Sequence, residues 1–314
     1  MIERALVTGG AGFIGANLVD RLVDDGAEVL VVDDLSRGKL DRLVSARGRG
    51  HIQIHQLDIR DEAFVEAAVR FAPEVVFHLA AQIDVRYSVE HPVVDASINV
   101  AGTVNALAAA VAAGARRLVF ASSGGAIFGE AAKLPTPEGS PRRPIAPYGV
   151  SKLVVDEYLR YFHESNGLEY VSLGFSNVYG PRQDPHGEAG VVAIFTEALL
   201  DGRRPMIFGD GSNSRDYVYV EDVTDACMRA AEYDGVGYFN IGTGVGTSVT
   251  DLFSMLRELT GKRIRPVFAD ARAGEVARSA LNPGLAARKL GWQPWTALND
   301  GLRLTVDWFT ENRP

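Results

Sequence analysis

Hydrophobic and polar positions in the first part of the chain alternate between short apolar runs and longer stretches with helical spacing. Short apolar runs predict buried strands, and apolar residues three and four positions apart predict helices packed against them. The expected strands are Ala5–Val7, Glu28–Asp33, Ile52–Leu57, Val75–Ala80, Arg117–Ser122 and Tyr170–Phe175. The expected helices follow a glycine-rich turn as far as Asp24 and cover Glu62–Phe71, Val93–Ala113 and Tyr148–Ser165. Repeated strand–helix units of this size predict an α/β fold with a doubly wound parallel sheet.

The regular alternation ends after about Phe175, and Asn177–Pro185 has the composition of a loop. Further helices are expected at Val191–Leu200, Asp222–Glu232, Thr250–Thr260, Pro283–Leu290 and the end of the chain, and further strands at Tyr217–Val220 and Phe239–Gly242. We therefore expect a smaller, interleaved α/β C-terminal domain over the edge of the sheet. The predicted bounds are 1–175 with about 216–240 for the sheet domain, and 176–215 with 241–314 for the smaller domain.

The first strand leads into the glycine-rich stretch Thr8–Gly15 (TGGAGFIG), and the second strand ends on Asp33. The earlier glycines let the backbone turn tightly beside a pyrophosphate, Gly15 lets the helix pack on the strand, and the helix N-terminus offers free N–H groups. An acid at the second strand end accepts hydrogen bonds from a ribose and repels a 2′-phosphate. The combination predicts a Rossmann dinucleotide site that prefers NAD, although the nearby Arg37 is a residue type that can serve NADP. The alternative is a glycine-rich turn in another kind of α/β protein.

Ligands on doubly wound sheets bind beyond the carboxyl ends of the strands. Tyr148 and Lys152 are expected at this edge, and their spacing places them on one helix face. A nearby ammonium favours a phenolate and lowers the pKa of a tyrosine, so the pair could move a proton on and off a substrate hydroxyl near neutral pH. The alternative for this pair is an ordinary amphipathic helix. Other polar or flexible groups expected at the same edge are Asp58, His78, Ser122, Ser123, Gly124 and Asn177.

The composition excludes several classes of function. The chain has 314 residues, 46% hydrophobic and 23% charged, and a net charge of -8, which argues against nucleic-acid or acidic membrane partners. Its one cysteine, Cys227, allows no internal disulfide or cysteine metal site, so a cytoplasmic location is expected. The histidines have no metal-ligand spacing, and His78 is expected to be structural. No apolar run of membrane-spanning length is expected.

Several longer motifs carry a resemblance that covers Ala5 to about Phe309. They are TGGAGFIG at 8–15, HLAAQ at 78–82, SSGGAIFG at 122–129, YGVSK at 148–152, NVYGPRQDPHGEAGVVAIF at 177–195, RDYVYVED at 215–222, NIGTG at 240–244 and LGW at 290–292. With these motifs the chain resembles the extended short-chain dehydrogenase/reductase superfamily, and within it the nucleotide-sugar 4-epimerases of the UDP-galactose 4-epimerase type.

The resemblance implies NAD as cofactor, a UDP-sugar as substrate, no metal, and a homodimer paired through the helices Val93–Ala113 and Tyr148–Ser165. The implied catalytic residues are Tyr148, Lys152, Ser123 and Ser122. The implied cofactor residues are Gly9, Gly12, Phe13, Ile14, Gly15, Asp33, Asp34, Ser36, Arg37, Gly38, Asp58, Ile59, Leu79, Ala80, Ala81, Gln82, Asn99, Tyr148, Lys152 and Phe175. The implied substrate residues are Ser123, Gly124, Tyr148, Asn177, Val191, Val192, Phe208, Arg215, Arg272 and Ser279.

The chain departs from the family pattern at three places. Gly124 stands where the family has the Ser or Thr that works beside the tyrosine, so Ser123 or Ser122 must serve, and Gly124→Ser is expected to be tolerated if there is room. Phe175 replaces a frequent Tyr beside the nicotinamide. Gly124-Gly125-Ala126 lacks the acids that dehydratases and decarboxylases carry there, so neither elimination nor decarboxylation is favoured.

These residues predict NAD-dependent 4-epimerisation of UDP-galactose and UDP-glucose through a transient 4-keto sugar. A UDP-glucuronate 4-epimerase ranks second. Such enzymes have an arginine near the position of Asp184 that meets the uronate carboxylate, and an aspartate there should repel that carboxylate. Ser279 is small at the position that walls the sugar's 2-substituent, so UDP-N-acetylhexosamines are expected as weaker substrates. A catalytically silent NAD-binding regulatory protein is the alternative from a different class, and the intact Tyr148–Lys152 pair argues against it.

Overall fold

Seven parallel strands form the central sheet of the molecule. The structure is a computed structural model that describes residues 1–186, 190–271 and 276–313. The strands stand in the order β10-β6-β5-β4-β1-β2-β3, and every neighbouring pair is parallel. Their bounds are β1 Arg4–Thr8, β2 Glu28–Asp33, β3 Ile52–Gln56, β4 Val75–His78, β5 Arg117–Ser123, β6 Glu169–Phe175 and β10 Gly237–Ile241. The predicted α/β fold with a doubly wound parallel sheet is confirmed.

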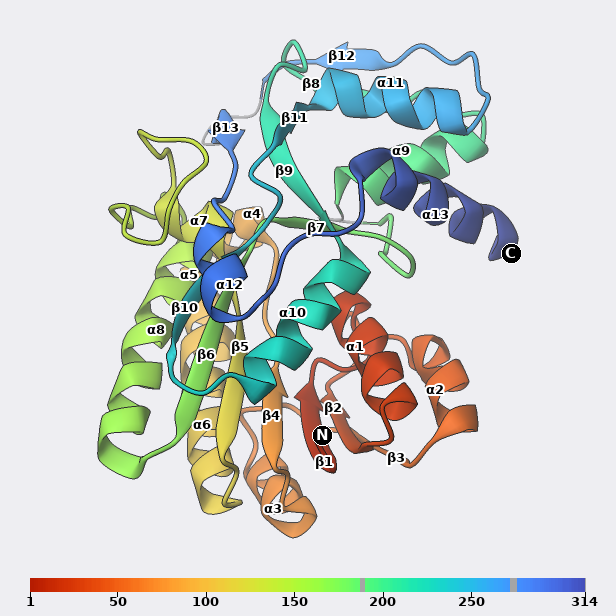
Figure 1. The fold of residues 1–314 in the computed structure, drawn as a ribbon. Coiled ribbons are helices and arrows are strands. Elements are labelled where there is room, and N and C mark those ends of the chain that lie inside the picture. The colour runs from red at the N-terminus through yellow and green to blue at the C-terminus, as the bar shows by residue number, and fades with distance from the viewer. Residues whose placement is uncertain (187–189, 272–275, 314) are drawn as a thin grey trace.

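Helices cover both faces of this sheet (Figure 1). Neighbouring strand residues point to opposite faces, so Val7 joins one apolar core and Leu6 the other. The first core lies under α1 (Phe13–Asp24), α2 (Val44–Arg49) and α10 (Val220–Glu232). The second lies under α3 (Glu62–Phe71), α6 (Gly102–Ala112) and α8 (Pro147–Asn166). Burial on both faces explains why the strands read as nearly continuous apolar runs.

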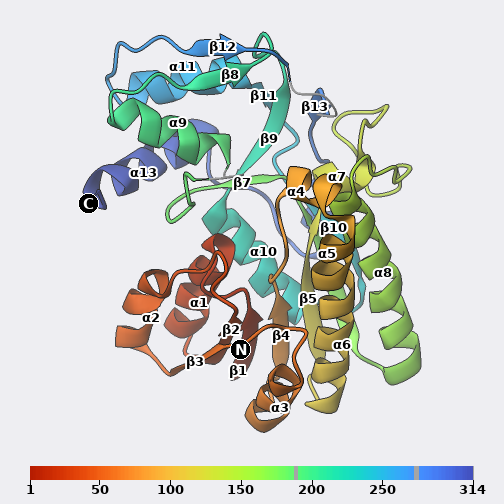
Figure 2. The same ribbon diagram turned by 180° about the vertical axis from the view of Figure 1, so that it is seen from behind.

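The helix predicted over Val93–Ala113 is interrupted. It consists of α5 (Pro92–Ala96), a π-helical turn η2 (Ser97–Ala101) and α6, which Figure 2 shows beside α8. A π turn inserts one extra residue and commonly marks a functional position. The whole run, Pro92–Ala112, is 21 residues long with a mean hydropathy of 1.3, so by length and composition it could cross a membrane, contrary to the sequence expectation. Its apolar character has a local reason, because Ala106, Leu107, Ala109 and Ala110 pack in the core against the sheet.

The second part of the chain builds a smaller layer above the carboxyl ends of the strands (Figure 1). One small sheet contains β7 (Asn177–Tyr179), β9 (Ser214–Tyr219), β11 (Gly246–Ser248) and β13 (Arg278–Ser279), and a second pairs β8 (Met206–Phe208) with β12 (Val267–Ala269). The helices α9 (Val191–Leu200), α11 (Val249–Leu259) and α13 (Leu298–Glu311) pack on a third apolar core. β10 and α10 return to the large sheet, so the two parts interleave in sequence.

Some short elements were not predicted from the sequence. The start of the predicted loop at Asn177 forms β7, because Asn177–Tyr179 pairs in parallel with Tyr217–Tyr219. Other short elements that were not expected are a 3-10 turn at Leu40–Leu43, α2, α4 (Val85–Glu90), α7 (Gly124–Phe128), β8, β11, β12 and β13. These segments have too few residues to display a hydrophobic period, so only tertiary contacts define them. The helix α12 (Gly284–Lys289) lies within the predicted range 283–290.

Candidate active site

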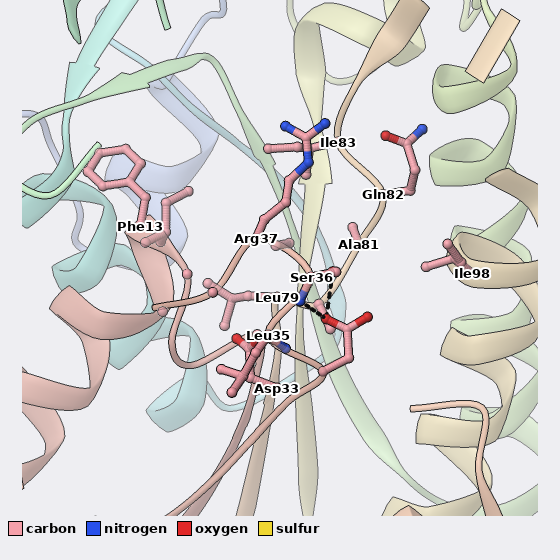
Figure 3. Close-up of a pocket in the computed structure, with 18 of the residues that line it drawn as sticks. Phe13, Asp33, Leu35, Ser36, Arg37, Leu79, Ala81, Gln82, Ile83 and Ile98 are labelled. Atoms are coloured by element: carbon pink, nitrogen blue, oxygen red, sulfur yellow. Dashed lines mark hydrogen bonds between the residues drawn. The ribbon is translucent and has the colours of Figure 1, made fainter. Parts of the chain in front are cut away.

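A cavity of about 700 Å³ lies where the carboxyl ends of the central strands meet. Every predicted cofactor residue lines it except Asn99. Labelled side chains converge on it from the glycine-rich loop with Phe13, from the end of β2, and from the segment 79–83 after β4 (Figure 3). Residues that line the cavity and that sequence reasoning did not single out are Val32, Leu35, Lys39, Arg42, Leu57, Ile83, Tyr87, Ile98, Ala121, Gln183, His186 and Gly190.

The glycine-rich loop has the shape that a dinucleotide requires. Gly9 has a φ of +68°, and a Cβ there would lie 2.8 Å from the backbone nitrogen of Ala80. A Cβ at Gly15 would collide with the carbonyl oxygen of Gly9. The N-cap of α1 is Gly12, whose lack of a side chain leaves the first N–H groups of the helix open toward the cavity. The close backbone approach and the uncapped helix end fit the pyrophosphate of NAD.

Asp33 is 7% exposed at the end of β2 and orders the loops on either side of it. Its Oδ2 accepts a hydrogen bond from the Ala11 N–H at 3.0 Å, and its Oδ1 accepts one from the Leu35 N–H at 2.9 Å. Burial raises the pKa of this carboxyl, and the two backbone hydrogen bonds oppose that rise. The neighbouring Asp34 accepts hydrogen bonds from both the N–H and the Oγ of Ser36, which are drawn as dashed lines in Figure 3.

Ion pairs join the segment after β2 to the opposite wall of the cavity. Lys39 Nζ lies 3.2 Å from a carboxylate oxygen of Asp184, and Arg42 lies 3.9 Å from the same oxygen. Arg37 forms an ion pair with Asp84 at 3.6 Å. The guanidinium that could have served NADP is therefore already paired with a carboxylate. The contacts of Asp184 weaken the sequence argument against a uronate substrate. That argument relied on the negative charge of Asp184, and two cations neutralise this charge.

Asn99 shapes the cavity without lining it. The π turn η2 carries it into the interior, where Nδ2 donates to the Gln82 carbonyl oxygen at 2.9 Å and Oδ1 accepts from the Gln82 N–H at 2.8 Å. Both Asn99 and Gln82 also donate to the Asp95 carboxylate at 2.9 Å, and Ser151 donates to its other oxygen at 2.6 Å. Asn99 is therefore corrected from a predicted direct contact to a residue that holds the Gln82 wall.

His78 is structural, as the sequence indicated. Its Nδ1 lies 2.8 Å from Thr8 Oγ1 and its Nε2 lies 2.9 Å from Thr103 Oγ1. Because Thr103 donates its own proton to the Asn99 carbonyl, His78 must donate through Nε2 and accept through Nδ1. Burial lowers the pKa of His78 to about 3, so it stays neutral.

Tyr148 and Lys152 lie on the first turns of α8 and both line the cavity. Lys152 Nζ donates to the Ala121 carbonyl oxygen at 2.8 Å and lies 5.8 Å from the centre of the Tyr148 ring. Burial lowers the pKa of Lys152 to about 8, while the carboxylates of Asp95 and Asp156 oppose the fall, so the ammonium persists at neutral pH. The sequence expectation of a lowered tyrosine pKa is not met, since burial raises the pKa of Tyr148 to about 12. A hydrogen bond from Ser123, rather than the Lys152 charge, opposes that rise.

The end of β5 presents two serines in different ways. Ser123 hydrogen-bonds the Tyr148 side chain, whereas Ser122 lines the cavity with a buried Oγ that has no partner among the described residues. The next position has no room for a side chain, because a Cβ on Gly124 would overlap the side chain of Leu281. Gly124→Ser was expected to be tolerated or beneficial only if there is room, and the position of Leu281 does not meet that condition.

Of the predicted substrate residues that the structure describes, only Tyr148 lines the cavity. Asn177 on β7 faces Tyr217 on β9, and the buried hydroxyls of Tyr217 and Ser176 have no partner in the part of the chain that the structure describes. Arg215 donates to the Ser214 and Ala277 carbonyl oxygens, and its strand pairs with Ser279. Val191 and Val192 start α9, and Phe208 ends β8. Arg272 lies outside the described residues.

The comparison with protein families decides the class of the protein. Residues 5–242 match the model of the NAD dependent epimerase/dehydratase family. The chain belongs to this family. It is thus an NAD-dependent enzyme, as the glycine-rich loop and the acid at the end of β2 predicted. The superfamily resemblance read from the motifs is also confirmed.

Several relatives that match the chain over nearly its whole length are UDP-glucose 4-epimerases. The chain is 48% identical to the UDP-glucose 4-epimerase of Mycolicibacterium smegmatis over 98% of both chains. The UDP-glucose 4-epimerase of Thermotoga maritima, solved with UDP-glucose, superposes with a TM-score of 0.94 at 47% identity, covering 98% of this chain and 99% of the other. The Thermus thermophilus UDP-glucose 4-epimerase complex with NAD gives a TM-score of 0.91 at 43% identity over 99% of this chain and 100% of the other.

Proposed function

We propose that this family member is a UDP-glucose 4-epimerase that interconverts UDP-galactose and UDP-glucose through a transient 4-keto sugar. The observation that carries the proposal is that Tyr148, which interacts with Ser123, and Lys152 line a cavity whose other side is the NAD-binding loop. The sequence and structural similarity to UDP-glucose 4-epimerases over 98% of the chain supports it. The test is to incubate the protein with a panel of UDP-hexoses without added cofactor and follow epimer formation by NMR.

Each catalytic residue has a defined task in this proposal. NAD bound in the cavity would supply the hydride acceptor and a positively charged nicotinamide ring. Positive charge in the same cavity favours the phenolate of Tyr148, which then takes the proton of the sugar's 4-hydroxyl and later returns it. Ser123 stabilises the phenolate by donating its hydrogen bond. Lys152, anchored on the Ala121 carbonyl, keeps a donor and a charge at the cavity wall.

The region beside the strand end distinguishes this reaction from elimination. Gly124, Gly125 and Ala126 begin α7 directly after Ser123 and carry no acid. Elimination at the neighbouring carbon needs an acid and a base placed there, so epimerisation is the favoured outcome. UDP-glucuronate remains a second candidate substrate, because the contacts of Asp184 with Lys39 and Arg42 neutralise the charge that counted against it.

We propose that Ser279 lines the part of the substrate site that holds the sugar's 2-substituent. Its Oγ lies 3.3 Å from the place where a Cβ on Gly125 would be, so it faces the strand end that carries Ser123. We predict that Ser279→Tyr removes turnover of UDP-N-acetylhexosamines and spares the plain UDP-hexoses, because the ring fills the space of the N-acetyl group. Ser279→Ala is the matched control and should keep both. Rates for both substrate pairs measure the effect, and an equal loss of both in Ser279→Tyr would mean that Ser279 is not the wall.

Asp33 is proposed to set the preference for NAD. We predict that Asp33→Ala weakens NAD binding roughly 10-fold or more and relaxes discrimination against NADP, because the substitution removes the repelling charge and leaves the Ala11 and Leu35 N–H groups without their acceptor. Titration of the cofactor-depleted protein with NAD and with NADP measures both effects. Asp34→Ala, one residue further from the strand, should change the ratio less. Equal affinity of the parent protein for NAD and NADP would contradict the assignment.

A homodimer is proposed through the faces of α5 and α8. Val150, Val154, Tyr158 and Tyr161 form one exposed apolar stripe along α8, each more than a third exposed. Val93 on α5, the neighbouring helix in Figure 2, is 81% exposed. Such a stripe on two adjacent helices suits isologous packing against a second copy.

The single cysteine, Cys227, is buried and unpaired, which is consistent with a cytoplasmic location.

We predict that light scattering after gel filtration gives twice the chain mass of 33.8 kDa. Combining Val150→Glu with Val154→Glu should shift the protein to the monomer mass, because charges within a buried apolar interface are costly. Val44→Glu on α2 adds a charge at another exposed valine outside the stripe and serves as the control. A monomeric parent would contradict the proposal.

A further inference from the structure

The side chain of Leu281 occupies the space beside the catalytic strand where the family has a hydroxyl. A Cβ built on Gly124 would lie 2.9 Å from Leu281 Cδ2 and closer still to Cδ1. Real Cβ atoms do not approach other carbons this closely, so a side chain at position 124 and the present rotamer of Leu281 exclude each other. Gly124 directly follows Ser123, whose hydroxyl contacts Tyr148.

The backbone on both sides of Leu281 is fixed. Its own N–H donates to the buried Asp216 carboxylate at 3.1 Å. On either side of it, Thr136 N–H donates to the Ala280 carbonyl at 2.8 Å, and Asn282 N–H donates to the Thr136 carbonyl at 2.9 Å. The main chain at Leu281 therefore has little freedom to withdraw from Gly124.

The Leu281 side chain is also fixed. It is 1% exposed and packs in an apolar cluster with Ile127 and Phe128 of α7. Moving it away from Gly124 would push it into these neighbours, because protein interiors are close-packed.

We propose that Leu281 is a positioning residue for the reaction: it fills the volume left by Gly124 and confines the hydroxyl that works with Tyr148 to Ser123. This inference deepens the proposed epimerase function and rests on it for its kinetic arm. In this arrangement the pair Gly124–Leu281 replaces the usual hydroxyl side chain, and the working hydroxyl moves back by one residue along β5. The two positions should therefore tolerate change only together.

The first test reads the steric coupling by thermal unfolding and needs no turnover, so it stands even if the proposed reaction fails. Gly124→Ser should lower Tm by roughly 3–8 °C through overpacking, and Leu281→Ala by roughly 5–15 °C through a cavity. The double variant should unfold within about 2 °C of Leu281→Ala alone, because the added side chain enters the vacated space. Gly125→Ala is the matched control, since its Cβ would meet only Ser279 Oγ at 3.3 Å, and its effect should be the same with and without Leu281→Ala. Additive losses in the Gly124–Leu281 pair would overturn the proposal.

The second test moves the hydroxyl that works with Tyr148 from position 123 to position 124. Gly124→Ser alone should lower kcat about 10-fold or more, and adding Leu281→Ala should recover most of it. In the Ser123→Ala background, adding Gly124→Ser with Leu281→Ala should raise kcat at least about 10-fold and return the pH–rate profile toward that of the parent. A role of Leu281 in stability alone would leave that pH profile unchanged. A fully active, stable Gly124→Ser single variant, or no gain in the Ser123→Ala background, would overturn the assignment.

Discussion

Replacing Tyr148 with Phe should abolish turnover while NAD remains bound. The substitution removes only the hydroxyl that takes and returns the proton of the sugar's 4-hydroxyl, and general acid–base groups of this kind contribute about 100- to 10,000-fold. The ring keeps its place on α8, and the glycine-rich loop and Asp33, which lie on other elements, are untouched. The measurements are kcat for UDP-galactose and the NAD content of the purified variant after denaturation.

The control for this variant is a tyrosine away from the cavity. Tyr170→Phe, on β6, removes a hydroxyl of the same kind from a partly buried ring and should leave kcat unchanged. An active Tyr148→Phe enzyme would contradict the assignment of Tyr148 as the base. Loss of NAD together with activity would instead show that the hydroxyl contributes to cofactor retention.

Removing the Ser123 hydroxyl should have the second largest effect. Ser123→Ala takes away the hydrogen bond that lowers the pKa of Tyr148, so the phenolate becomes harder to form. We expect kcat to fall roughly 100- to 10,000-fold at neutral pH. Since the folded-state pKa of the tyrosine rises further in the variant, the rising limb of its pH–rate profile should move to higher pH, and raising the pH should recover part of the rate.

Ser122→Ala is the comparison for this prediction, because its buried Oγ has no partner in the described structure. It should cost less in kcat than Ser123→Ala and should not move the pH profile. An unchanged rate in Ser123→Ala, with a loss in Ser122→Ala, would move the role to Ser122.

Features defined by neighbouring residues could be predicted from the sequence. The bounds of β2, α3 and α9 match their apolar patterns, and Asp33 lies at a strand end because the strand itself stops there. The meeting of the strand ends at one edge follows from the parallel topology alone, which is why most of the predicted cofactor residues line one cavity.

Features that depend on contacts between distant segments could not be predicted. The pairs Lys39–Asp184 and Arg37–Asp84 join loops that no local pattern relates. The collision between Gly124 and Leu281 likewise depends on β13 and the residues after it folding back over β5. The pKa of Tyr148 was misjudged for the same reason, since the spacing to Lys152 is visible in the sequence and the burial of the hydroxyl is not.

The measurement that most directly tests the central claim follows UDP-galactose by NMR in D₂O with the purified protein and no added cofactor. The proposed reaction removes hydrogen from sugar carbon 4 and returns that same hydrogen to the opposite face. We predict that UDP-glucose accumulates to equilibrium and that carbon 4 keeps its original hydrogen in both sugars. Failure of UDP-galactose to convert, or deuterium entering carbon 4 from the solvent, would contradict the account.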